Sequence, residues 1–366
     1  MSRSLIRQQV LHFEPYCPGL SIEEIKERYS LSSVIKLASN ENPLGASPKV
    51  LQALEKQLTE VYRYPRTGSP RLRQVLGAYH GVPEDRIVVG NGSDELIDLL
   101  IRVAVEPARD HILAFQPCFN IYRLQSKLCD VAFHQIALRS DFTFPMQELL
   151  EAVNDATAIV FLTTPDNPSG FAPLVEEVLG LHHRLPEDCL LVVDEAYMDF
   201  AVPQERYSIM SLAGRAPNLV VLRTFSKLYG LAGLRLGYGV MPARLADYLL
   251  RVKLPFSVNV LAEAAGIAAL DDDAFRGETI RTVIQGREML THALGKMGFL
   301  VYPSQANFIL VKPSMAASEL FEKLLRRGII IRPLTNYGLT DHLRISIGNA
   351  EENRALLWAI QDILSP

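Results

Sequence analysis

The sequence predicts an α/β fold, in which a large domain with a mostly parallel central sheet precedes a smaller α+β domain. Short, unbroken apolar runs are typical of strands buried on both faces of a parallel sheet, and they cover residues 86–89, 111–115, 158–162, 189–193 and 218–222. Helical patterns separate these runs, as crossover connections between parallel strands require. After about residue 255 this alternation stops and a different order of elements begins.

We therefore expect the chain to divide into three segments. Residues 1–40 are expected to form an N-terminal arm and a helix that pack with the small domain, residues 41–254 the large domain, and residues 255–366 the small C-terminal domain. The small domain is expected to contain a long helical stretch, then strands alternating with helices, at 258–294, 307–311, 315–327, 328–332, 343–347 and 350–363.

Capping residues mark where several of the helices begin. Ser21 is followed three residues later by Glu24, which is a capping-box pattern. Ser47 precedes Pro48, so a capping hydroxyl stands before a proline at the first helical position. The helix expected after residue 92 has acidic residues in its first turn, where the helix dipole favours them.

The composition excludes several classes of protein. The chain has 366 residues, of which 48% are hydrophobic and 21% charged, and these values are typical of a globular protein. Its net charge of -4 argues against a nucleic-acid binder. The apolar runs are too short for a membrane span or a signal peptide, and the four cysteines form no CxxC pair, so we expect a cytoplasmic protein without a disulfide framework.

The segment 223–238 has the highest density of candidate functional residues. It directly follows a predicted strand, so Lys227 should lie at the carboxyl edge of the sheet, where open α/β sheets bind ligands. The hydroxyls of Thr224 and Ser226 flank the lysine, and Arg235 follows, a combination that suits a phosphate group. The residues leave two roles open for the lysine: a point charge for the phosphate, or an amine that forms a Schiff base with an aldehyde.

Polar residues also follow three other predicted strands of this sheet. Asp194 directly follows the run 189–193 and is either a helix cap or a site residue. A second metal ligand at suitable spacing is missing from the sequence around it, so we expect no metal site. Asn167 either initiates a turn or belongs to the site. The junction 90–95 offers backbone N–H groups to an anion, but it matches a dinucleotide-binding loop only in part, because Glu95 stands in the place of a glycine.

Together these junctions supply an anion cradle, an amide, a carboxylate and a lysine, which is the set that pyridoxal phosphate needs. At this point the chain resembles the fold-type I pyridoxal-phosphate aminotransferases over nearly its whole length. The motifs that carry the resemblance are residues 15–19, 39–48, 62–65, 90–95, 166–170, 194–197, 224–238, 332–334 and 342–348. The resemblance implies a fold-type I transferase with pyridoxal 5′-phosphate as cofactor and transamination as its activity.

The resemblance also implies a role for each matching residue. Lys227 would bond covalently to the cofactor and move the substrate's Cα proton, Asp194 would pair with the pyridinium nitrogen, and Tyr197 would donate to the phenolate oxygen. The other implied cofactor contacts are Asn167 at the phenolate, Phe119 against the ring, and Gly92, Ser93, Asp94, Thr224, Ser226 and Arg235 at the phosphate. Relatives commonly have tyrosine where Phe119 stands, so we expect the stacking contact without the hydroxyl.

The implied partners are an amino donor, a 2-oxo acid and a second copy of the chain. Tyr64 matches the tyrosine that reaches a partner subunit's phosphate, which implies a homodimer with shared sites. Arg344 matches the arginine that binds the substrate's anionic end, and the rest of that pocket would comprise Tyr16, Asn42, Asn307 and Arg332. The arm and the C-terminal segment favour L-histidinol phosphate and 2-oxoglutarate as substrates, in histidine biosynthesis; an arginine fork suits both phosphate and carboxylate.

Other functions remain possible at this point. An aromatic amino acid aminotransferase or a phosphothreonine decarboxylase would keep the fold and change the substrate. A dinucleotide-dependent oxidoreductase built on residues 90–95 would need the missing third glycine. A regulator without catalytic activity would have no need of Lys227, Asp194 and Arg344 together.

Overall fold

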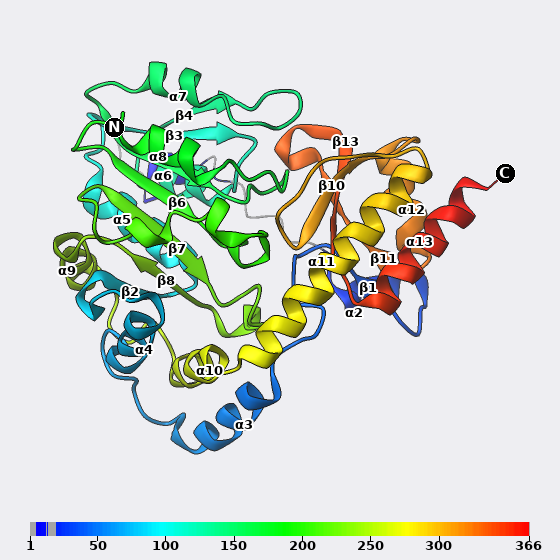
Figure 1. The fold of residues 1–366 in the computed structure, drawn as a ribbon, viewed down its shortest axis with the longest axis horizontal. Coiled ribbons are helices and arrows are strands. Elements are labelled where there is room, and N and C mark those ends of the chain that lie inside the picture. Colours follow the sequence, from blue (N-terminus) through cyan, green and yellow to red (C-terminus); the bar gives the residue numbers. More distant parts are fainter. Residues whose placement is uncertain (1–4, 12, 14–19, 366) are drawn as a thin grey trace.

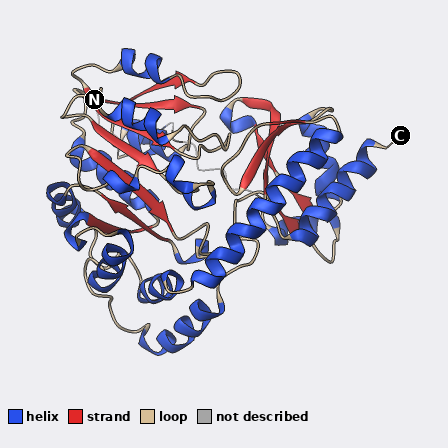
Figure 2. Cartoon of the chain, viewed as in Figure 1, coloured by secondary structure: helices blue, strands red, loops and turns tan. Residues whose placement is uncertain are grey.

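The two larger sheets of the described residues lie side by side and are linked by a long helix. The computed structural model describes residues 5–11, 13 and 20–365. In Figure 1 the larger sheet lies on the left and the smaller one on the right, and α11 (Asp273–Lys296) runs from one part to the other. Helices cover the strands in both parts (Figure 2).

The larger sheet has seven strands within the described residues, in the spatial order β2-β8-β7-β6-β5-β3-β4. All neighbouring pairs are parallel except those that β8 makes, so the sheet is mostly parallel, as predicted. Its strands are β2 (Ile87–Asn91), β3 (His111–Gln116), β4 (Ala132–Ala137), β5 (Thr157–Thr163), β6 (Leu190–Asp194), β7 (Leu219–Thr224) and β8 (Leu236–Val240).

Alternate residues of these strands enter separate cores on the two faces of the sheet. Val192 and Val220 pack in a cluster with residues of α5 (Ser93–Ala104), α6 (Ile121–Leu128) and α9 (Ala243–Val252). Val193 and Val221 belong to the larger cluster on the other face. That face is covered by α4 (Pro70–His80), α7 (Met146–Ala152), α8 (Val175–His182) and α10 (Val260–Leu270), and α3 (Pro48–Gln57) packs on α10. Burial on both faces explains the unbroken apolar runs of the inner strands β3, β5, β6 and β7.

The smaller part contains an antiparallel sheet of order β12-β13-β10-β9. Its strands are β9 (Leu300–Val301), β10 (Phe308–Lys312), β12 (Arg332–Leu334) and β13 (Leu339–Ser346), and its helices are α12 (Ala317–Arg326) and α13 (Ala350–Leu364). β1 (Ile35–Lys36) pairs with β11 (Ile329–Ile330). Ile25 of α2 (Ile22–Tyr29) packs with Leu325 and Ile330, so the N-terminal segment contacts this part; α1 (Gln8–Leu11) lies near α6.

Some elements differ from the prediction. The long stretch expected to be helical over 258–294 consists of two helices: the chain leaves α10 after Leu270, and Asp272 caps α11 by accepting from the N–H of Phe275. α10 packs on α3 and α4, whereas α11 continues to the smaller sheet. The sequence analysis also missed β4, whose burial alternates at the edge of the sheet, and β8. The division into domains at residues 40 and 254 stays a proposal.

The predicted capping residues are confirmed. The Ser21 side chain accepts from the N–H of Glu24, and the Ser47 side chain accepts from the N–H of Val50. Within the described residues, none of the helices has the length and apolar character needed to cross a membrane.

Candidate active site

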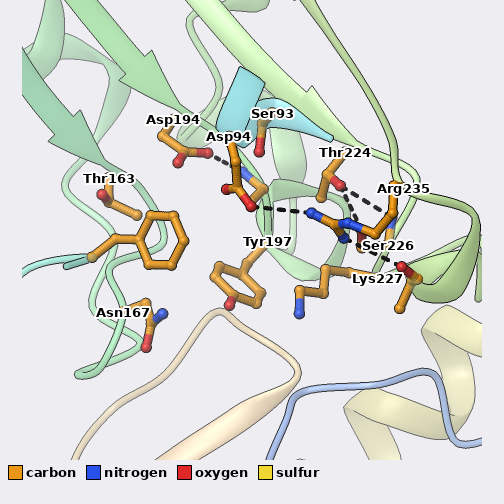
Figure 3. Close-up of a pocket in the computed structure, with 13 residues that line it drawn as sticks. Ser93, Asp94, Thr163, Asn167, Asp194, Tyr197, Thr224, Ser226, Lys227 and Arg235 are labelled. Atoms are coloured by element: carbon orange, nitrogen blue, oxygen red, sulfur yellow. Dashed lines mark hydrogen bonds and ion pairs between the residues drawn. The ribbon is translucent and has the colours of Figure 1, made fainter. Parts of the chain in front are cut away.

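A pocket opens where the strands of the larger sheet reach their carboxyl ends. Thr163, Asp194 and Thr224 are the last residues of β5, β6 and β7, and all three line it. The connections after these strands add further polar side chains, and α5 begins at its edge (Figure 3). Its lining residues are Ser93, Asp94, Phe119, Thr163, Asn167, Asp194, Ala196, Tyr197, Thr224, Ser226, Lys227, Ala232 and Arg235. The structure thus brings together ten side chains that the sequence analysis selected.

Asp194 is a buried carboxylate whose hydrogen-bond donors are neutral. Its exposed fraction is 3%, and its oxygens accept from the Tyr122 hydroxyl at 2.8 Å and the Ala196 N–H at 3.1 Å. Burial raises the pKa of Asp194 to about 6, and the hydrogen bond from Tyr122 opposes that rise. A cation entering the pocket beside Asp194 would therefore relieve an unfavourable buried charge.

At the other end of the pocket, hydroxyls and a guanidinium lie close together. The Ser226 N–H donates to Thr224 Oγ1 at 3.1 Å, and the Thr224 hydroxyl donates to Ser226 Oγ at 3.0 Å. Arg235 Nη2 lies 3.0 Å from Asp94 Oδ2. Gly92 has a φ of +76°, and a Cβ there would lie 2.7 Å from Arg235 Nη2, so glycine lets the guanidinium approach the backbone. Hydroxyls, a guanidinium and the start of α5 together suit a phosphate group.

Asp94 is the acidic member of this end. Burial raises the pKa of Asp94, and the nearby Arg235 opposes the rise. The pairing with Arg235 holds the guanidinium beside Gly92, and an incoming phosphate would compete with Asp94 for it.

Lys227 supplies the amine of the pocket. Its Nζ donates to the carbonyl oxygen of Ser39 at 3.2 Å and lies 5.5 Å from the centre of the Tyr197 ring. In Figure 3 the Lys227 amine lies beside Tyr197, and Asp194 lies on the opposite side of the group of residues drawn. A ligand that bridges Lys227 and Asp194 would lie across the pocket.

Asn167 and Tyr197 are arranged to donate hydrogen bonds into the pocket. Arg344 Nη1 donates to Asn167 Oδ1, which leaves the Asn167 NH2 group to serve as a donor. The Tyr197 hydroxyl accepts from Asn40 Nδ2 at 3.2 Å, so its own proton is available. Two donors on one side of a ligand favour an oxygen with negative charge.

Four predicted substrate residues do not line the pocket, and one of them, Arg332, lines a separate cavity. Arg344, 7% exposed, donates to the carbonyl oxygen of Ala38 at 2.8 Å as well as to Asn167. Arg332 stands opposite Arg344 in the register of β12 and β13. Asn307 Nδ2 donates to the carbonyl oxygen of Asn40, in the segment before α3. Asn42 Nδ2 donates to the carbonyl oxygen of Leu228, the residue after Lys227.

The two remaining candidates lie elsewhere. Tyr64 is 83% exposed, outside the pocket, and its ring stacks on that of Phe256 with 4.8 Å between centres. Tyr16 lies outside the described residues.

Sequence analysis missed Tyr122, Thr163 and Asn40. The sequence pattern could have indicated Thr163, because it is a polar residue at the end of its strand, as Asp194 and Thr224 are. In the structure Thr163 stands beside Asp194 in the strand register. Tyr122 gave no local signal, since it is one aromatic residue on an amphipathic helix.

Comparison with known proteins identifies the family of the chain. The sequence model described as "Aminotransferase class I and II" matches residues 32–360. The chain belongs to the class I and II aminotransferases. The match includes all the lining residues of the pocket, and Tyr16 precedes it.

Several relatives within the class I and II aminotransferases cover nearly the whole chain. Histidinol-phosphate aminotransferase of Nitratidesulfovibrio vulgaris (strain Hildenborough) is 55% identical over 359 residues, which cover 98% of this chain and 96% of the relative. The protein of the same name from Oleidesulfovibrio alaskensis is 53% identical over 363 residues, with coverages of 98% and 95%. A crystal structure of histidinol-phosphate aminotransferase from Sinorhizobium meliloti in complex with pyridoxal-5′-phosphate has a TM-score of 0.88 at 25% identity, covering 99% of this chain and 98% of that one.

Proposed function

We propose that this aminotransferase uses pyridoxal 5′-phosphate to transfer the amino group of L-histidinol phosphate to 2-oxoglutarate, forming imidazole-acetol phosphate and L-glutamate in histidine biosynthesis. The observation that carries the proposal is the placement of the Lys227 amine and the buried Asp194 carboxylate in one pocket. The relatives named histidinol-phosphate aminotransferase, more than half identical over nearly the whole chain, support the choice of substrate.

The pocket fits the proposed cofactor at each of its polar groups. Asp194 has no cationic donor among the residues that the structure describes and would pair with the ring nitrogen, while Asn167 and Tyr197 offer donors to the phenolate oxygen. Phe119 lines the pocket where a ring would stack. The phosphate would be held by Gly92, Ser93, Thr224, Ser226 and Arg235, with Asp94 beside them. When bound, pyridoxal phosphate supplies an electron sink for negative charge at the substrate's Cα.

The chain's own residues would then bind the substrate and move its proton. Lys227 Nζ is the basic group placed to take the proton from the amino donor's Cα. The guanidinium of Arg344 is buried beside Asn167, where it would bind the phosphate of one substrate or the carboxylate of the other. The other residues that we assign to the substrate pocket are Tyr16, Asn42, Asn307 and Arg332.

We also propose that the enzyme is a homodimer with shared sites. The exposed Tyr64 and its stacking partner Phe256, 43% exposed, present aromatic surface that a second copy would cover. Tyr64 would then contact the partner subunit's phosphate. A cytoplasmic location stays a prediction.

A comparison of substrates tests the proposed function. The purified protein loaded with pyridoxal phosphate is offered histidinol phosphate or phenylalanine, each with 2-oxoglutarate, and glutamate formation is measured. In a separate assay it is offered phosphothreonine, and release of carbon dioxide is measured. We expect kcat/KM to be at least about tenfold higher for histidinol phosphate, a difference of about 1.4 kcal/mol in barrier. A preference for phenylalanine, or release of carbon dioxide from phosphothreonine, would contradict the proposal and favour the corresponding alternative.

A further inference from the structure

Behind Asp194 lies a buried tyrosine that does not itself line the pocket. Tyr122, on α6, is fully buried, and its ring stacks on Phe161 with 4.4 Å between centres and 6° between planes. Its hydroxyl oxygen lies 2.8 Å from Asp194 Oδ2 and 2.7 Å from Thr163 Oγ1. The ring is thus fixed by packing, and the hydroxyl is held between the ends of two neighbouring strands.

The direction of these hydrogen bonds follows from counting protons. The Tyr122 hydroxyl has one proton and donates it to Asp194, so the Thr163 hydroxyl is the donor to the Tyr122 oxygen. The second Asp194 oxygen accepts from the Ala196 N–H. One donor on each oxygen fixes the orientation of the carboxylate while leaving it open toward the pocket.

The same hydrogen bond affects the charge of Asp194. Burial favours the neutral acid, whereas a hydrogen bond to the carboxylate favours the ionised form. Burial raises the pKa of Tyr122 well above its ordinary value, so the tyrosine keeps its proton and remains a donor.

We propose that Tyr122 is a positioning residue, which aims the Asp194 carboxylate at the cofactor's ring nitrogen and holds its negative charge there. This inference rests on the proposed function, because it requires pyridoxal phosphate in the pocket. Tyr122 acts through Asp194 and does not touch the cofactor.

The test compares two cofactors that differ only at the ring nitrogen. Dissociation constants are measured for pyridoxal phosphate and for its 1-deaza analogue, in which carbon replaces that nitrogen, with the parent and with Tyr122→Phe. The variant keeps the ring stacked on Phe161. We expect pyridoxal phosphate to bind at least about tenfold more weakly to Tyr122→Phe, because a hydrogen bond to a charged group is lost, with no weakening for the analogue.

A matched control removes the hydroxyl of another buried tyrosine, one that lies on the larger sheet. Tyr238 lies on β8, and its hydroxyl is 2.8 Å from His80 Nε2, away from the pocket. Tyr238→Phe should leave the ratio of the two dissociation constants at the parent value. If Tyr122→Phe does not fold, Thr163→Val removes the donor to Tyr122 instead and should weaken only pyridoxal phosphate, by a smaller factor.

The outcomes separate this inference from the proposed function. Equal weakening of both cofactors by Tyr122→Phe would show a merely structural role and overturn the inference, as would unchanged affinity for both. A parent protein that does not bind pyridoxal phosphate would instead overturn the proposed function, and the inference with it.

Discussion

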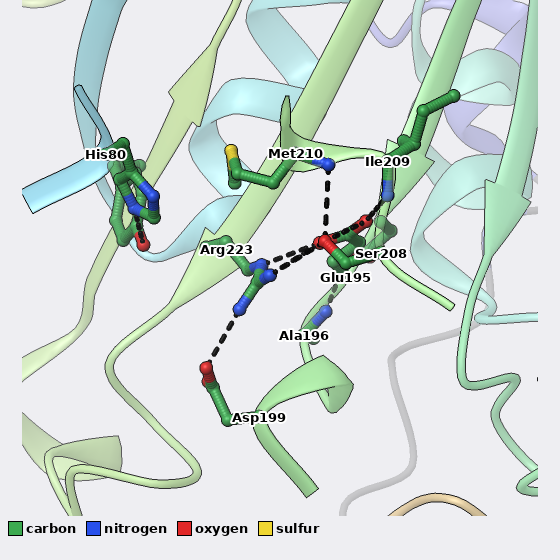
Figure 4. Close-up of polar contacts among 10 residues, drawn as sticks. His80, Glu195, Ala196, Asp199, Ser208, Ile209, Met210 and Arg223 are labelled. Atoms are coloured by element: carbon green, nitrogen blue, oxygen red, sulfur yellow. Dashed lines mark hydrogen bonds and ion pairs between the residues drawn. The ribbon is translucent and has the colours of Figure 1, made fainter. Parts of the chain in front are cut away.

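Two consecutive carboxylates, Asp194 and Glu195, are both buried at the end of β6, yet their surroundings differ. Glu195 has no exposed surface, and it accepts from Arg223 Nε at 2.9 Å, from the Ser208 hydroxyl at 2.8 Å and from the Ile209 N–H at 2.8 Å (Figure 4). Arg223 also donates to Asp199 at 2.8 Å. Asp194 has two neutral donors. Within the fold, the Arg223 guanidinium therefore neutralises Glu195, whereas Asp194 has no such partner among the described residues.

The difference indicates which side of the strand is structural and which is functional. A buried carboxylate is costly unless it is paired, and Glu195 and Arg223 pair to join the ends of β6 and β7. For Asp194 we propose pairing with a cation that comes from outside the chain. Substitutions of Glu195 and its partners should therefore change mainly stability, whereas substitutions of the pocket residues should change mainly activity.

Lys227→Ala should give the largest effect on the pocket side. Loss of a general base lowers rates by about 10²- to 10⁴-fold. The free energy of unfolding of the cofactor-free protein should change by less than about 0.5 kcal/mol, because the half-buried side chain makes its hydrogen bond to a single carbonyl oxygen, that of Ser39. Transaminase assays and urea denaturation measure the two quantities. Activity within about tenfold of the parent would contradict catalysis by Lys227.

Among substitutions on the Glu195 side of the strand, Arg223→Met should have the largest effect on stability. It leaves Glu195 buried without a cation, which should lower the free energy of unfolding by about 3–5 kcal/mol. The matched variant Arg223→Met with Glu195→Gln removes both charges and should recover a large part of that loss. Urea denaturation of the cofactor-free proteins measures both. If the single and double variants were equally destabilised, the lost ion pair would not be the cause.

The comparison also shows what the sequence could and could not predict. Apolar runs located most of the larger sheet, and polar residues directly after those runs, such as Asp194 and Lys227, do meet in one pocket. Parallel strands make this possible, because their carboxyl ends share one edge. Contacts between distant segments were beyond prediction: Tyr122 reaches Asp194 from another element, and Arg223 was not recognised as the partner of Glu195.

Asp194→Asn should give a smaller effect, with opposite signs for stability and for function. Burial raises the pKa of Asp194 from 3.8 to about 6, so between these values the folded protein retains a proton that the unfolded chain has lost. The parent therefore loses stability as the pH rises through this window, by up to about 3 kcal/mol, and the loss persists above it. Asparagine has no such proton, so cofactor-free Asp194→Asn should gain stability relative to the parent over the same window.

Urea denaturation of both cofactor-free proteins from pH 4 to pH 8 measures this difference, and the other titrating groups cancel in it. Glu195→Gln provides the contrast, because it removes a carboxylate that Arg223 already neutralises and should bring no gain at neutral pH. With pyridoxal phosphate present the order should reverse, since only the parent offers a negative charge to the ring nitrogen. A stability difference between parent and Asp194→Asn that does not change with pH would mean that Asp194 is already paired within the fold, as Glu195 is.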